Sequence, residues 1–168
     1  MPTQSSHSVK IILGIDPGTR ITGYGLIKVE SSDFKPIDFG CIRPPVDAEL
    51  PQRYHTLFKG ISQLIKLHSP HAIAVETQFL NKNVQSTMKI AMARAAVLIA
   101  ATEHNIPIFE YTPKKAKKAV VGNGSAGKEQ VQRMIQLLLR LPSLPEPEDA
   151  ADALSLAICH AHTLKNYK

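Results

Sequence analysis

Two short apolar segments limit the folds that this sequence can adopt. IILGID (11–16) is rich in β-branched residues, HAIAVE (71–76) is apolar on both alternating faces, and each segment ends in an acidic residue. Strands of this kind are buried on both faces, as in sheets that carry helices on either side. The sequence therefore predicts an α/β protein whose central strands lie between layers of helices.

The remaining segments complete this sheet. Runs with strand composition are separated by Gly and Pro, and apolar residues recur at helical spacing elsewhere. Three early strands followed by alternating helices and strands predict a mixed five-stranded sheet flanked by helices on both faces. The further strands are expected over 22–30, 34–44 and 106–111, and the helices from Pro51 and over 84–103, 127–141 and 148–162.

The composition is that of an ordinary soluble domain. The 168 residues are 43% hydrophobic and 20% charged, and no apolar run reaches the length needed to cross a bilayer. Two distant cysteines, Cys41 and Cys159, show no metal-ligand spacing, which is typical of idle or buried thiols in a reducing compartment. We expect a cytoplasmic protein without a membrane partner, with a flexible extension over 1–10 and a single domain over 11–168.

Four carboxylates are predicted to meet at one edge of the sheet. Asp16 and Glu76 close the two apolar strands, and the carboxyl ends of neighbouring strands share one crevice. Asp149 and Asp152 lie three residues apart near the start of the last predicted helix, so both project from one face. Close carboxylates repel unless cations neutralise them, and Mg²⁺ prefers oxygen ligands of this kind. Two such ions stabilise an in-line phosphoryl displacement.

Each acidic residue also has a simpler explanation. Acidic residues in a first helical turn interact favourably with the helix dipole, and Asp16 precedes a Pro-Gly turn. Glu76 is harder to explain in this way, because burying an unpaired charge at the end of an apolar strand is costly. The metal hypothesis therefore depends on the four residues together.

The motifs around these residues resemble the RuvC family of bacterial Holliday-junction resolvases. The resemblance runs from Ile11 to the C-terminus through IILGIDPGTRITGYGLI, AVETQF, VVGNGSAGKEQV and DAADALSLAICHAH, in that order. It implies a ribonuclease-H-like fold and a homodimer that nicks opposing strands of four-way junction DNA. It also implies Mg²⁺, for which Mn²⁺ can substitute, and work alongside the RuvA–RuvB branch-migration machinery.

The resemblance assigns roles to individual residues as well. The family's acidic tetrad matches the same four carboxylates, which implies two metal ions per site. Two lysines that approach the scissile phosphate match Lys117 and Lys128. The aromatic residue beside the site matches Phe79, which can stack on an unpaired base, although a place in the core is the alternative. A histidine at this end of the family's last helix is a further candidate for catalysis and matches His160.

Basic residues flank the predicted acidic crevice in a chain of net charge +6. Charge clusters are usually solvated faces, but an acidic site repels DNA, so surrounding lysines are expected to contact its backbone. The Ala- and Met-rich segment 84–103 is more apolar than one small core requires and is predicted to form a twofold dimer interface. The predicted DNA-binding residues are Phe79, Lys82, Lys114, Lys115 and Lys118.

Two motifs resemble nucleotide-binding loops. GNGSAGK (122–128) has P-loop spacing, but Glu129 stands where Ser or Thr is needed and no strand precedes the loop. DPGTRITG (16–23) resembles the phosphate loop of actin-like ATPases, which need two similar domains. The alternatives to a junction resolvase are another ribonuclease-H-like nuclease, a non-catalytic junction-binding module and a fragment of an actin-like ATPase.

Overall fold

The structure, a computed structural model, describes residues 9–77 and 83–165. The predicted DNA-binding residues Phe79 and Lys82 lie outside these ranges. The described elements are, in order, β1 (Lys10–Asp16), β2 (Thr22–Glu30), β3 (Asp33–Ile42), α1 (Leu50–His68), β4 (Ala72–Glu76), α2 (Val84–Glu103), β5 (Ile108–Tyr111), α3 (Pro113–Val121), α4 (Lys128–Leu139) and α5 (Glu148–Lys165).

The predicted mixed sheet is confirmed. The strands lie in the order β3-β2-β1-β4-β5. β2 pairs with both β1 and β3 in antiparallel fashion, whereas β4 pairs with both β1 and β5 in parallel. The apolar strands β1 and β4 are therefore neighbours near the centre of the sheet, and their carboxyl ends lie at the same edge.

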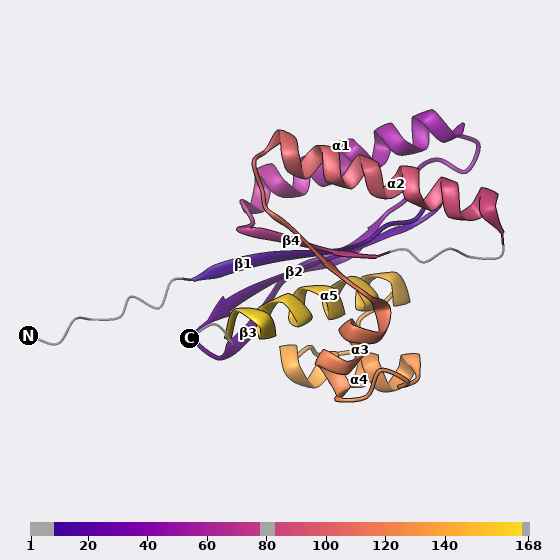
Figure 1. The fold of residues 1–168 in the computed structure, drawn as a ribbon. Coiled ribbons are helices and arrows are strands. Elements are labelled where there is room, and N and C mark those ends of the chain that lie inside the picture. Colours follow the sequence, from indigo (N-terminus) through magenta and orange to yellow (C-terminus); the bar gives the residue numbers. More distant parts are fainter. Residues whose placement is uncertain (1–8, 78–82, 166–168) are drawn as a thin grey trace, which may run out of the picture.

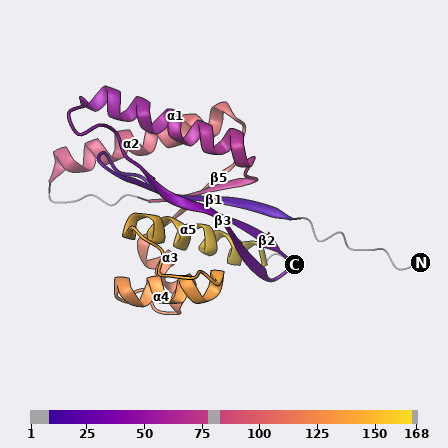
Figure 2. The same ribbon diagram turned by 180° about the vertical axis from the view of Figure 1, so that it is seen from behind.

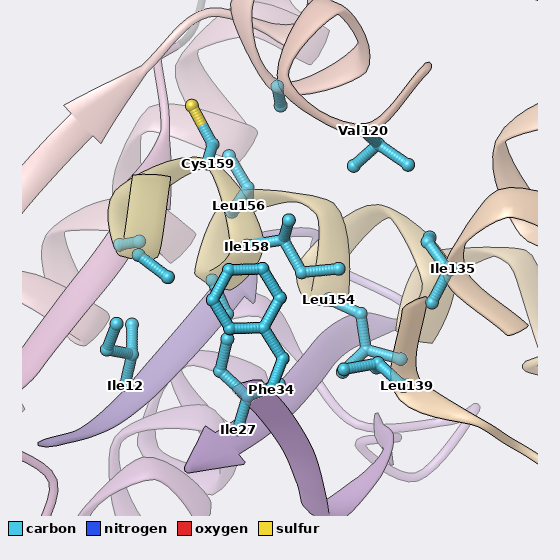
Figure 3. Close-up of a cluster of buried hydrophobic side chains, with 14 of the residues drawn as sticks. Ile12, Ile27, Phe34, Val120, Ile135, Leu139, Leu154, Leu156, Ile158 and Cys159 are labelled. Carbon is cyan, nitrogen blue, oxygen red and sulfur yellow. The ribbon is translucent and has the colours of Figure 1, made fainter. Parts of the chain in front are cut away.

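Helices cover both faces of the sheet, as the sequence predicts. α1 and α2 lie on one face, α5 lies on the other, and α3 and α4 form an outer layer against α5 (Figures 1 and 2). Buried side chains form one core on each face. Figure 3 shows the core on the α5 face, where Ile12 and Ile27 of the strands lie on one side of Leu154 and Ile158, and Val120 and Ile135 of α3 and α4 lie on the other.

One helix is additional to the predicted order. The basic segment before the glycine loop is a separate helix, α3, which begins at Pro113. The side chain of Thr112 accepts a hydrogen bond from the backbone N–H of Lys115, and proline is favourable in a first helical turn. α3 ends at Gly122, which adopts the left-handed conformation that glycine tolerates best.

α2 corrects the expectation that no segment has the length and composition to cross a bilayer. An 18-residue stretch of this 20-residue helix reaches a mean hydropathy of 1.2, so the helix is long and apolar enough to cross a bilayer by length and composition alone. Ala, Val, Ile, Leu and Met make up most of the helix, and its charged residues are Lys89, Arg94 and Glu103. Small side chains along one side pack into the core, as in a helix that covers a sheet, and these buried residues are Ala93, Ala96, Val97, Ala100 and Ala101.

Candidate active site

Asp16 and Glu76 end the two central strands side by side. Ile15 pairs with Val75 in parallel register, so the next residue of each strand carries a carboxylate at the same sheet edge. The loop after Asp16 is closed by Thr22, whose hydroxyl accepts a hydrogen bond from the Gly18 N–H at 3.1 Å and donates one to the Gly18 carbonyl at 2.9 Å. The end of β1 is therefore held in place up to the point where the chain turns away.

Three glycines allow α5 to lie directly on the sheet. Gly14 pairs with Gly25 across β1 and β2, and Gly23 pairs with Asp16. A Cβ atom on Gly23 would lie 1.9 Å from the carbonyl oxygen of Asp149, and one on Gly14 would lie 1.9 Å from that of Ala153. The backbone of α5 thus passes immediately over the strand ends and carries Asp149 and Asp152 to the edge where Asp16 lies.

These glycines were not identified from the sequence as functional residues. Gly23 and Gly25 lie two residues apart, so they share one face of β2, and glycine inside a strand marks a close approach of another backbone. This two-residue spacing is the sequence feature from which the close approach of α5 could have been predicted.

The carboxylates lie within electrostatic range of one another. Burial, with further contributions from Glu76, Asp152 and Asp149, raises the pKa of Asp16 to about 8. Burial and the charge of Asp152 raise the pKa of Glu76 to about 7. Burial also raises the pKa of Asp152, and Lys128 opposes this shift. The four residues predicted to meet at this edge therefore form one electrostatic group, which we call the tetrad.

The tetrad is not arranged as a closed metal cage. Across residues 9–77 and 83–165, no three Asp, Glu, His or Cys side chains lie close enough together to enclose one ion. The donor set itself fits a hard divalent cation, because it consists of carboxylate oxygens that are partly withdrawn from water and whose charges disfavour one another.

Two lysines border the tetrad from different helices. Lys117, half-buried on α3, lowers the pKa of Glu76 against the effect of burial and also acts on Asp152. Lys128, the first residue of α4, acts on both Asp16 and Asp152. These are the two lysines that the family resemblance placed at the scissile phosphate.

The other predicted DNA-binding lysines on α3 differ in their surroundings. Lys114 is exposed, and its Cγ lies 2.5 Å from where a Cβ on Gly124 would be, so its side chain crosses the glycine loop. Lys118 is also exposed. Lys115 extends over the ring of Tyr111, with its Nζ 5.1 Å from the ring centroid. The glycine loop itself follows a helix and not a strand, which agrees with the rejection of a P-loop.

His160 lies in the core between α5 and β5. Its Nδ1 is 2.7 Å from the hydroxyl of Tyr111, and its ring stacks on Phe109 with a centroid distance of 4.1 Å. Burial lowers the pKa of its imidazole. Since eight helical residues span about 12 Å, His160 lies roughly two turns from Asp152 along α5.

Cys41 is a neighbour of the tetrad that the sequence did not indicate. It pairs with Gly23 on β2, which places it in the same row across the sheet as Asp16. Burial and the charge of Asp149 raise the pKa of its thiol, so the thiol is held in its less reactive, protonated form. The other cysteine, Cys159, is buried as expected.

The fold and this site define a class of protein. Carboxylates gathered at the ends of two central strands and on one helix, bordered by lysines, suit an α/β nuclease that acts on a phosphodiester. Comparison with known proteins then identifies the family.

The family model described as "Crossover junction endodeoxyribonuclease RuvC" matches residues 12–160. The RuvC protein of Protochlamydia amoebophila is 59% identical over 151 residues, which are 90% of either chain, and that of Chlamydia pneumoniae is 50% identical over 160 residues, 94% of this chain and 95% of its own. A solved structure of Thermus thermophilus RuvC in complex with Holliday junction substrate is 30% identical and superimposes with a TM-score of 0.89, over 94% of this chain and 96% of that one. This chain belongs to the RuvC family, whose members are metal-dependent nucleases.

Proposed function

We propose that this chain resolves four-way DNA junctions by hydrolysing a phosphodiester at the tetrad. The observation that carries this proposal is the gathering of Asp16, Glu76, Asp149 and Asp152 at one sheet edge, where burial and mutual repulsion raise carboxylate pKa values. Such a site is favourable only when cations neutralise it.

The proposed cofactor is Mg²⁺, with Mn²⁺ as a substitute and two ions per site. When bound, the ions would supply the Lewis acidity that activates a water molecule and stabilises the leaving oxygen. The tetrad would hold them through its carboxylate oxygens, with Asp16 and Glu76 losing the protons that their raised pKa values retain near neutral pH. Lys117 and Lys128 would donate hydrogen bonds to the phosphate oxygens as negative charge increases there.

The proposed assembly is a homodimer formed through α2. Val84, Met88 and Met92 recur every fourth residue and are at least half exposed, so they form one apolar stripe along the helix. An apolar stripe of this length on a helix is typical of a contact with another protein surface. A twofold axis at this stripe would give two tetrads related by symmetry, which suits the two opposing strands of a junction.

Several roles stay predictions from the family resemblance. They are the stacking of Phe79 on an unpaired base, the contacts of Lys82, Lys114, Lys115 and Lys118 with the DNA backbone, cooperation with RuvA–RuvB and a cytoplasmic location.

The test uses a labelled synthetic four-way junction. Incubation with Mg²⁺ should give paired nicks on opposing strands, and EDTA should abolish them while binding persists. An RNA–DNA hybrid and a linear duplex of the same sequence serve as comparison substrates. Preferential cleavage of either one over the junction would contradict the proposal, and so would junction binding without nicks in Mg²⁺.

A further inference from the structure

We propose that Glu148 is a positioning residue for Lys128. Its carboxylate accepts a hydrogen bond from the Lys128 ammonium group, and a phosphate of bound DNA displaces the carboxylate from it. This inference depends on the proposed function, because it concerns how one lysine of that site meets the substrate. Glu148 does not belong to the tetrad and was not among the residues predicted from the sequence.

The contact joins the first residues of two helices. The Nζ of Lys128, at the start of α4, lies 2.6 Å from the Oε2 of Glu148, at the start of α5. One turn further along α4, the side-chain amide of Gln132 donates a hydrogen bond to the carbonyl of Pro145 at 3.1 Å. The two helix starts are therefore held together by a second contact, which keeps the carboxylate of Glu148 within reach of the lysine.

Both members of the pair are exposed to solvent, so a DNA phosphate can reach Lys128. The side chains of Lys128 and Glu148 are 63% and 55% exposed. Beside Glu148 is a hollow of about 600 Å³ lined by Gln132, Glu146, Pro147 and Glu148. A carboxylate and a phosphate both accept hydrogen bonds from an ammonium group, so a phosphate arriving here would compete with Glu148 for the same donor.

Lys128 interacts with two groups of carboxylates. Its charge acts on Asp16 and Asp152 of the tetrad, and its ammonium group is hydrogen-bonded to Glu148. Glu148 thus competes with an incoming phosphate for this ammonium group.

A double-mutant cycle tests this role. Binding of a labelled four-way junction is measured in EDTA, which prevents cleavage, for the wild type, Glu148→Gln, Lys128→Ala and the double variant. Glu129→Gln is the matched control, since Glu129 is the next residue after Lys128, pairs with Arg133, and loses the same single charge on substitution. Thermal unfolding confirms that each variant is folded.

We expect Glu148→Gln to tighten junction binding about three-fold more than Glu129→Gln does, a gain typical of releasing one exposed ion pair. In the Lys128→Ala background the two substitutions should have equal effects. A gain from Glu148→Gln that persists without Lys128 would overturn the inference, as would weaker binding by Glu148→Gln alone. If the wild type itself failed to bind the junction, the proposed function would be the part in error.

Discussion

The two faces of the sheet are covered by helices of opposite character. α5 lies between the sheet and the outer helices, and every residue from 153 to 161 is buried. α2 buries five small side chains on its inner side and leaves four large apolar residues exposed. A helix covered on both sides has a fixed position, which suits a carrier of the proposed metal ligands. A helix covered on one side retains a surface for a partner.

The largest expected effect on nicking comes from a residue of α5, on the sheet face that the outer helices also cover. Asp152→Asn removes a charge from the tetrad without changing the shape of the side chain, so junction binding should persist while nicking falls by roughly 1000-fold. Rates of nicking and junction affinity are measured on the same preparation. Cleavage at the native rate would remove Asp152 from the mechanism.

The close packing of α5 gives the second prediction. Gly23→Ala places a Cβ where the carbonyl of Asp149 now lies, so the start of α5 must move away from Asp16. We expect nicking to fall by roughly 100-fold, because small displacements of catalytic groups cost about that much. The control is Gly127→Ala, where a Cβ would meet no atom within 4 Å and φ is −70°. Equal activity of the two variants would contradict the importance of this contact.

The exposed side of α2 gives the third prediction. Met88 lies at the centre of the apolar stripe of α2 and is 55% exposed. Met88→Glu should weaken dimerisation by about 30-fold, the effect of losing one central interface residue, without unfolding the chain. Sedimentation at micromolar concentration measures the change. Leu137→Glu is the control, since Leu137 is 70% exposed on α4, which lies on the other face. A wild type that is monomeric under these conditions would refute the interface.

The fourth prediction concerns the stability of the metal-free protein. Asp16 and Glu76 have pKa values near 8 and 7 in the folded state, above their ordinary values of 3.8 and 4.5. The folded state therefore binds more protons than the unfolded chain in this range. The contribution of these groups to stability is lost as the pH rises from about 4 to about 8.

Asp16→Asn removes the contribution of Asp16. In EDTA at pH 8 it should raise the free energy of unfolding by at least about 1 kcal/mol, less than the full shift implies because water and neighbouring charges screen the group. At pH 4 the difference from the wild type should vanish. Denaturant unfolding of the wild type and of Asp16→Asn at the two pH values measures this difference in the free energy of unfolding. A difference that is independent of pH would contradict the assigned pKa shift.

The strands and the tetrad could be predicted because short-range patterns determine them. Apolar character on both faces marked β4 as central, and the carboxylates at the ends of β1 and β4 were expected to share one crevice as the ends of neighbouring strands. The two strands are indeed neighbours, and they pair in parallel. The spacing of Asp149 and Asp152 fixed their common helix face.

The remaining features depend on how distant segments dock. The pair of Lys128 and Glu148 joins residues 20 positions apart, and no local pattern places the starts of α4 and α5 beside each other. The same holds for Cys41, which reaches the tetrad through the pairing of β3 with β2. The family resemblance matched His160 to a catalytic position. Its contacts with Tyr111 and Phe109 could not be predicted, because they follow from the packing of α5 on β5.

The most direct test of this account is the position of bound metal. Crystals of the protein soaked in Mn²⁺ should give anomalous scattering between Asp16, Glu76, Asp149 and Asp152. Bound Mn²⁺ located away from these four carboxylates would contradict the central claim.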